Sequence, residues 1–411
     1  MAVAHHVFST ITILYNQVSL QRTGKLYMKI VVAPQAFKGS LSATEVGNSM
    51  IKGIENVIED SNNILVPVAD GGDGTLETLV ESSKGEINSI KVTGPLCEQQ
   101  DAAWGALGRN KTAIIEMARS SGLALVPSNK LNPLIATTYG LGEVISDALN
   151  RGYRDFIIGI GGSATNDGGA GMAQALGIRL LDSKGNELAF GGESLSKLST
   201  IDMAGIDSRI KESNFAIACD VNNPLTGPEG ASAIYGPQKG ATPKMVNILD
   251  KALTNFAYIV EKHLGTEIDQ VEGAGAAGGL GGGLIAFLNG KLRKGVDIVL
   301  DFVELDKALV GANLVITGEG QLDFQTIYNK APIGVAKRAK NLGIPVIAIS
   351  GSLGKNFSVV HEHGIDAASP ITSKPMTLEE ASKNAPELIS SATEQALRYL
   401  KTGVQVFKNQ I

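Results

Sequence analysis

Six short runs of mostly apolar residues recur along the chain, and each is a candidate strand. A run without polar alternation is typical of a strand that is buried on both faces of a parallel sheet. The runs cover residues 30–33, 64–68, 156–160, 215–219, 313–317 and 344–349. Amphipathic segments separate them, and this alternation of strands and helices predicts the α/β class.

The segments between the runs carry helix signals. A capping box at 42–45 precedes an apolar stripe that extends to Ile58. A second stripe spans 141–149, and Pro332 and Gly343 bracket a third helix. These helices would cover the faces of the predicted sheet.

One stretch departs from the alternation and indicates a second domain. Residues 91–118 contain turns between alternating stretches that resemble hairpins. We therefore predict a discontinuous Rossmann-like parallel-sheet domain, residues 28–90 and 295–411, with an inserted second α/β domain, residues 91–294. Residues 1–27 differ in character from the rest of the chain and are predicted to be a leader or a disordered extension.

Composition and charge narrow the function. The 411 residues are 43% hydrophobic with a formal charge of -5, and no run of Lys and Arg occurs, which argues against nucleic acid as a partner. No apolar run approaches the ~18 residues that span a bilayer, so no membrane partner and a cytoplasmic location are expected. Cys97 and Cys219 are the two cysteines, which suits a reducing compartment.

Glycine is over-represented, with 49 of 411 residues, about 12% against a usual ~7%. Two of the glycine-rich loops are acidic and follow apolar strands. Glycine lets backbone amides approach a phosphate, and carboxylates there can hold Mg²⁺ or accept a proton. The candidates are Asp70, Gly71, Gly72 and Asp73 in the first loop and Gly318, Glu319, Gly320 and Asp323 in the second. Asp is also common at helix N-caps, so one acid of the first pair can be a cap only.

Three further residues lie in turns that suit anion or metal chemistry. Lys38 follows the first strand, where α/β sheets bind ligands, and could contact a phosphate or carboxylate. Asp220 follows another apolar strand and is a metal or substrate candidate, and Lys239 in a glycine turn is a phosphate candidate. The alternative for each is an Asx-turn or an ordinary surface turn. The chain contains no Walker A pattern.

The loop after residues 156–160 supports a different function. Its sequence fits G-x-G-x-x-A after a strand, and Asp182 lies at the spacing of a ribose contact. Gly161, Gly162, Ser163 and Asn166 are its candidate cofactor-binding residues. The polar continuation to residue 171 lies where a dinucleotide fold would already be helical, which weakens this interpretation. Residues 278–283 suggest either an anion site at a helix N-terminus or close helix packing.

Taken together, these segments resemble the bacterial glycerate kinases of the type that also includes glycerate 2-kinases. The resemblance runs from Met28 to about Leu400 and is carried by several motifs in order. They are 33–41 (APQAFKGSL), 68–75 (VADGGDGT), 159–169 (GIGGSATNDGG), 218–225 (ACDVNNPL), 236–241 (GPQKGA) and 317–320 (TGEG). The family often has Asp-Ser where this chain has Gln35 and Ala36, so position 35 offers no carboxylate. Many relatives also have glycine where Asn329 precedes Lys330.

The resemblance implies ATP-dependent phosphorylation of D-glycerate in organic acid or glyoxylate metabolism, with Mg²⁺, in a two-domain protein whose active site lies in the cleft between the domains. The 2-phosphoglycerate product is favoured, and association into a homo-oligomer is left open. The predicted catalytic residues are Lys38, Asp70, Asp73, Asp220 and Lys239. The predicted metal ligands are Asp73, Asp220, Glu319 and Asp323.

Two other functions are compatible with the sequence. An NAD-dependent oxidoreductase of a small hydroxy acid would use the loop at Gly159. A non-catalytic sugar-acid binding protein would bind glycerate without turnover, although the several acidic loops then have no reason to hold magnesium. Which carboxylate is the base, and which loop binds ATP, are open at this stage.

Overall fold

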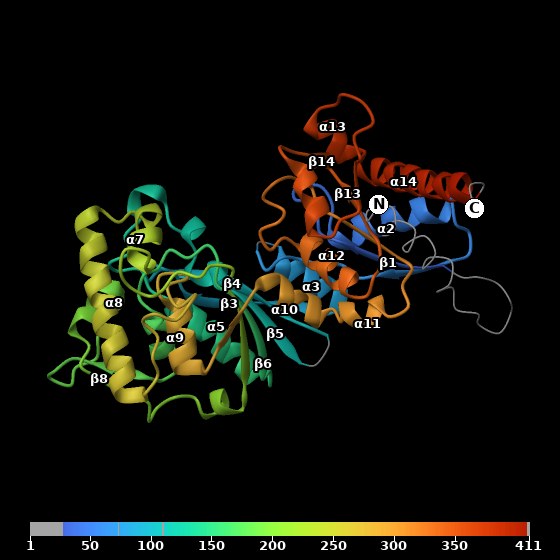
Figure 1. The fold of residues 1–411 in the computed structure, drawn as a ribbon. Helices are drawn as coiled ribbons and strands as arrows, with labels where there is room; N and C mark the ends of the chain where they lie inside the picture. Colours follow the sequence, from blue (N-terminus) through green and yellow to red (C-terminus); the bar gives the residue numbers. More distant parts are fainter. Residues whose placement is uncertain (1–27, 73, 109–110, 409–411) are drawn as a thin grey trace. The chain divides into compact units, whose positions relative to one another are not determined.

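The computed structural model describes residues 28–72, 74–108 and 111–408 (Figure 1). The predicted leader and the predicted catalytic residue Asp73 lie outside the described residues. The chain divides into a discontinuous unit, Met1–Asp70 with Val299–Ile411, and a continuous unit, Gly71–Ile298. The division falls after Asp70 and Ile298, whereas the predicted domains divide after residues 90 and 294. The predicted domain boundaries, and the cleft between the domains, stay predictions.

The discontinuous unit is built on a five-stranded parallel sheet with the order β15-β13-β11-β1-β2. Its strands are β1 (Met28–Pro34), β2 (Ser61–Leu65), β11 (Leu314–Gly318), β13 (Val346–Ser350) and β15 (Ala367–Pro370). In chain order within this unit, the arrangement is 2-1-3-4-5, the flavodoxin-like form of the doubly wound fold. The predicted α/β class is therefore confirmed.

Helices cover this sheet in the way that their apolar stripes predict. Its helices are α2 (Ala43–Glu55), α11 (Leu305–Leu309), α12 (Ala331–Asn341), α13 (Leu378–Lys383) and α14 (Ala385–Lys408). Helix α2 has the predicted capping box and lies beside α14, while α12 contacts β1, β11 and β13 (Figure 1). Buried Ile30, Met50 and Ile316 belong to the core beneath α2 and α14. A two-stranded sheet, β12 (Gln321–Leu322) with β14 (Ser352–Leu353), extends from the strand ends.

The strand predicted at 64–68 is displaced in the structure. Strand β2 begins in polar residues at Ser61 and ends at Leu65, because it lies at the edge of the sheet where one side meets solvent. Val66 and Val68 still donate backbone hydrogen bonds to Val32 (2.8 Å) and Pro34 (3.0 Å). The apolar run therefore identified the buried continuation of the strand rather than the strand itself.

The continuous unit has a six-stranded mixed sheet with the order β10-β9-β6-β5-β4-β3. Strands β3, β4 and β5 are antiparallel neighbours, as the hairpin-like turns predicted, and β5, β6, β9 and β10 run parallel. Its strands are β3 (Glu86–Thr93), β4 (Gln99–Ala106), β5 (Thr112–Glu116), β6 (Asp155–Gly159), β9 (Asn214–Ala218) and β10 (Lys291–Arg293). A separate antiparallel pair joins β7 (Arg179–Leu181) and β8 (Thr200–Asp202).

The helices of the continuous unit enclose a large apolar core around Trp104, Phe156 and Phe256. They are α3 (Thr75–Ser83), α4 (Ala118–Ser121), α5 (Tyr139–Asn150), α6 (Ala170–Ala175), α7 (Ala231–Tyr235), α8 (Pro243–Leu264) and α9 (Leu280–Leu288). Helix α10 (Gly295–Phe302) spans the division between the units. No helix in the described part of the chain is long and apolar enough to cross a membrane.

Candidate active site

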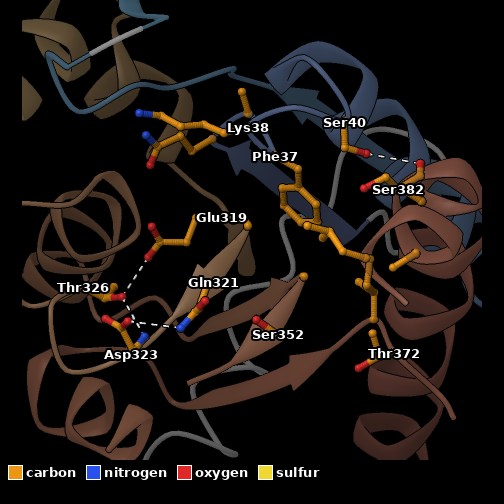
Figure 2. A pocket seen from close by; sticks show the side chains of 18 of the residues that line it. Phe37, Lys38, Ser40, Glu319, Gln321, Asp323, Thr326, Ser352, Thr372 and Ser382 are labelled. Atoms are coloured by element: carbon orange, nitrogen blue, oxygen red, sulfur yellow. Dashed lines mark hydrogen bonds between the residues drawn. The ribbon is translucent and has the colours of Figure 1, made fainter. Parts of the chain in front are cut away.

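A pocket lies at the carboxyl ends of β1 and β11 in the discontinuous unit. The chain leaves β1 towards β2 on one side and leaves β11 towards β13 on the other, so these two strands flank the point where the winding reverses. Doubly wound sheets bind ligands in the crevice at this point. The pocket has a volume of about 590 Å³ and is lined by the turn after β1, the loop after β11 and residues 371–385 (Figure 2).

Glu319 is the most buried acidic side chain in this pocket. It follows β11 directly and is 9% exposed, and its carboxylate accepts a hydrogen bond from Thr326 Oγ1 at 2.9 Å. The pKa of Glu319 is raised to about 7, mainly by burial; the hydrogen bond from Thr326 and the charge of Lys330 oppose the rise, and the charges of Asp70 and Asp323 add to it. The carboxyl group therefore lies among both cations and anions in a poorly hydrated site.

Lys330 adds a positive charge to the pocket that contains Glu319. Its Nζ lies 3.0 Å from Asp70 Oδ2, although the two residues are 260 positions apart. Lys330 is the N-cap residue of α12, and Asp70 follows the segment that continues β2. Lys38, in the turn after β1, also lines the pocket, and Figure 2 shows it near Glu319. Two of the predicted catalytic residues, Lys38 and Asp70, thus lie in the same unit as Glu319.

Asp323 lines the same pocket and shapes the loop that follows β12. Its Oδ1 accepts a hydrogen bond from the Gln325 amide at 2.7 Å, and its own amide donates to Thr326 Oγ1 at 3.1 Å. Gly320 also lines the pocket. Gly318 instead packs against the carbonyl of Ile349 in the neighbouring strand, where a side chain would clash. Packing within the sheet therefore accounts for Gly318.

The oxygen-rich end of the pocket has the donors that a hard cation prefers. Magnesium in phosphoryl-transfer sites is usually held by one or two carboxylates together with substrate phosphates. Glu319 and Asp323 offer such carboxylates, and their mutual repulsion would be relieved by a cation. Within the described residues, no cluster of three or more His, Cys, Asp or Glu side chains is placed to hold a metal ion by itself.

Other predicted site residues meet around Gly295 in the continuous unit. Asp220 Oδ1 accepts a hydrogen bond from the Gly295 amide at 3.2 Å. Gly71 has a φ of +90°, and an added Cβ would lie 2.6 Å from Gly295 Cα. The Gly72 carbonyl accepts from Thr75 Oγ1 at 2.6 Å at the start of α3. These contacts bring the first acidic loop and the Asp220 loop together.

Lys239 is buried in the continuous unit, so its interpretation as an ordinary surface turn is wrong. It is 1% exposed, and its Nζ donates to Ser163 Oγ at 2.7 Å and to the Thr165 carbonyl at 2.6 Å. Burial lowers the pKa of Lys239 to about 7, partly opposed by Asp167. Asn166 is also buried and donates to Ser232 Oγ at 3.0 Å. Lys239 therefore supports the glycine loop from within.

The same loop is open to solvent only at its beginning. Gly161 and Gly162 are exposed at the carboxyl end of β6, whereas residues 163–170 are buried. The next helix, α6, begins only at Ala170. A dinucleotide fold would place a helix N-terminus directly after the glycines, so the geometry disfavours the oxidoreductase interpretation.

Sequence reasoning did not identify Thr326 and Asp167 as site residues. Asp167 is fully buried and accepts hydrogen bonds from the amide (2.8 Å) and hydroxyl (2.9 Å) of Thr138. Its position inside the loop after β6 was a signal that could have indicated a structural carboxylate. Nothing in the sequence near Thr326 indicated that its hydroxyl would reach Glu319.

Comparison with known proteins agrees with these motifs. The profile of the Glycerate kinase family matches residues 30–401. The chain is 49% identical to the Glycerate kinase of Bacillus subtilis (strain 168) over 380 residues, which covers 92% of this chain and 100% of that protein. It is 48% identical to the Glycerate 2-kinase of Escherichia coli (strain K12) over 378 residues, covering 92% and 99%.

A solved structure is also similar. A crystal structure from Salmonella typhimurium LT2, of a protein proposed to be glycerate kinase 2, superposes with a TM-score of 0.85 at 47% sequence identity. The match covers 92% of this chain and 100% of that one. The similarity therefore extends over both units and leaves few described residues outside it.

Proposed function

The chain belongs to the glycerate kinase family, and on that premise we propose that it transfers the γ-phosphoryl group of ATP to D-glycerate, giving ADP and phosphoglycerate. The observation that carries the proposal is the similarity of almost the whole chain to proteins named as glycerate kinases. The charged pocket of the discontinuous unit supplies chemistry that suits this reaction. We favour the 2-hydroxyl as the acceptor because one of these relatives is named a glycerate 2-kinase.

The lysines of the pocket would stabilise the transferred group. Phosphoryl transfer passes through a loose transition state whose charge is spread over the phosphoryl oxygens, so its catalysis depends on positioning and electrostatics. Lys38 and Lys330 line the pocket and present ammonium groups to an anion there. The ion pair with Asp70 fixes the position of Lys330.

The acids of the pocket, Glu319 and Asp323, and Asp70, which pairs with the lining residue Lys330, have two roles in the proposal. Asp70 would orient the glycerate hydroxyl and accept its proton, while Glu319 and Asp323 would hold Mg²⁺. Magnesium, when bound, neutralises charge on the ATP phosphates. Four predicted site residues lie in the continuous unit: Asp220, Lys239, Gly161 and Gly162. We propose that they too contribute to phosphoryl transfer. Asp73 is proposed to act beside Asp70.

A coupled ADP-release assay over small hydroxy acids tests the function. We expect ADP release with D-glycerate and MgATP, and little with L-glycerate, glycolate or lactate. Phosphorus NMR of the product would identify the phosphorylated position. No ADP release with D-glycerate would contradict the proposal, and reduction of NAD⁺ by any of these acids would support the oxidoreductase instead. A cytoplasmic location and a homo-oligomer stay predictions.

A further inference from the structure

The pocket of the discontinuous unit has two chemically different ends. Its charged lining residues come from the turn after β1 and from the segment between β11 and α12; they are Lys38, Glu319, Asp323 and Lys330. The lining residues between 371 and 385 carry no charge. They are Ile371, Thr372, Met376, Thr377, Leu378, Ala381, Ser382 and Ala385. Figure 2 shows Thr372 and Ser382 on the side away from Glu319, with Phe37 between the two ends.

The size of the pocket exceeds what glycerate needs. Small-molecule sites usually enclose roughly 300–1,000 Å³ and surround most of a drug-sized ligand. A volume of about 590 Å³ lies within that range, and a three-carbon acid would fill a small part of it. Because glycerate is charged and small, it gives no reason for a long uncharged extension. A nucleotide has both a highly charged end and a large, uncharged, planar end.

We propose that this pocket binds the nucleotide, with the base at the uncharged end against Phe37, Ile371 and Met376 and the phosphates directed to Lys38 and Lys330. Phe37 and Ile371 are each 5% exposed and belong to the core of this unit, so packing holds these apolar side chains in place at the pocket. Aromatic and aliphatic side chains are the usual lining for a planar ring. This assignment rests on the proposed function, because it takes ATP as the phosphoryl donor.

A buried acceptor in the pocket supports a ligand there. Gln35 lines the pocket directly after β1 and is 8% exposed, yet its Oε1 has no hydrogen-bond partner among the described residues. Buried polar atoms are normally paired, so an unpaired one at a pocket wall is expected to meet a ligand donor. A ribose hydroxyl of a bound nucleotide would supply that donor.

Helix α13 connects the uncharged end to the turn that carries Lys38. Ser40 Oγ donates to the Ser382 carbonyl at 3.3 Å, across 342 positions of sequence. Phe37 and Ser40 therefore line one side of the uncharged end, and Ala381 and Ser382 line the opposite side. A larger side chain in place of Ala381 would reduce the space for a base without removing a charge.

Photolabelling of the full chain with 8-azido-ATP locates the base directly. We expect labelled peptides from residues 35–40 or 371–385, protected by excess ADP. Labelling confined to the continuous unit, for instance to residues 159–167, would overturn the assignment. This result does not depend on whether the protein phosphorylates glycerate.

Steric blocking gives a second test, with Lys383→Phe as the matched control on the same helix. Lys383 is exposed and does not line the pocket. We expect Ala381→Phe to raise the Kd for ADP at least tenfold by calorimetry, and to leave the KM for glycerate within twofold, while Lys383→Phe changes neither. An unchanged Kd for ADP, or a change confined to the glycerate KM, would refute the assignment. If circular dichroism shows that Ala381→Phe is unfolded, Met376→Ala should still weaken ADP three- to tenfold, and an unchanged affinity would refute it.

The two proposals can fail separately. If ADP binds and Ala381→Phe blocks it, but D-glycerate gives no ADP release, the proposed function fails and the nucleotide assignment stands. If glycerate is phosphorylated and neither variant affects ADP, the assignment fails and the function stands.

Discussion

Replacing Lys239 by methionine should remove a pH dependence from the stability of the continuous unit. The Lys239 ammonium is 1% exposed and donates to Ser163 Oγ and to the Thr165 carbonyl. Methionine has a similar length and no proton to lose. The variant therefore tests whether burial lowers the pKa of Lys239.

The sign of the effect is set by the protons bound in each state. The pKa of an unfolded lysine is about 10.5, whereas burial lowers the pKa of Lys239 to about 7 in the fold. Between these values the unfolded state binds more protons, so the free energy of unfolding rises with pH. Linkage then gives the wild type a gain of about 2 kcal/mol between pH 7 and pH 9 that the methionine variant lacks.

The single tryptophan makes the measurement specific to one unit. Trp104 is fully buried in β4 of the continuous unit, so its fluorescence reports the unfolding of that unit in urea. Free energies of unfolding would be compared at several pH values for the wild type and Lys239→Met. Lys251→Met is the matched control, because Lys251 is exposed on α8, and its curve should run parallel to that of the wild type.

Two results would contradict the reasoning. If the wild type and Lys239→Met change in parallel between pH 7 and pH 9, Lys239 does not titrate in that range. If Lys251→Met flattens the curve equally, the effect does not come from burial. Asp167 opposes the pKa shift of Lys239, and burial raises the pKa of Asp167 itself, so Asp167→Asn is added to Lys239→Met to remove this second carboxyl from the comparison.

Two further predictions concern turnover and packing. Lys38→Ala should lower kcat for glycerate phosphorylation about a hundredfold, since removing one charge-stabilising group costs ~3 kcal/mol of barrier; Lys337→Ala, exposed on α12 away from the pocket, should retain activity, and equal rates for both variants would exclude Lys38. Gly278→Ala should destabilise the continuous unit by about 3 kcal/mol in the tryptophan-fluorescence assay, because a Cβ would clash with backbone and φ is +72°. Gly265→Ala, with φ +67° but open space, should cost only about 1 kcal/mol, and equal losses would exclude the clash.

Much of the fold could be predicted because apolar runs report burial on both faces of a sheet. The runs at 156–160 and 215–219 correspond to β6 and β9 almost residue for residue. The edge strand β10 (Lys291–Arg293) was not predicted, because it is short and its polar side chains face solvent. Strand β10 pairs with β9, where Lys291 lies opposite Ala216, and no local pattern records a partner so far along the chain.

The candidate site could be predicted best where charged residues closely follow a predicted strand. Glu319 and Lys38 follow β11 and β1, and the rule that ligands bind at strand ends identifies both. The ion pair of Lys330 with Asp70 joins residues 260 positions apart, so it depends on the tertiary fold. The burial of Lys239 was hidden for the same reason, since a lysine in a glycine turn is usually exposed.

The glycine clusters show why composition alone could not separate binding from packing. An added Cβ at Gly278 would meet the Thr165 carbonyl and lie 2.6 Å from Asn166 Cα, and one at Gly283 would meet the Gly168 carbonyl. Residues 278–283 therefore pack directly against the backbone of the loop after β6. This packing favours the interpretation of close helix packing over that of an anion site. A ligand and a neighbouring backbone both require the absence of a side chain, so the same residue type serves either. The exposure of Gly161 and Gly162 leaves these two as the glycines of that loop that a ligand can reach without displacing the packed backbone behind them.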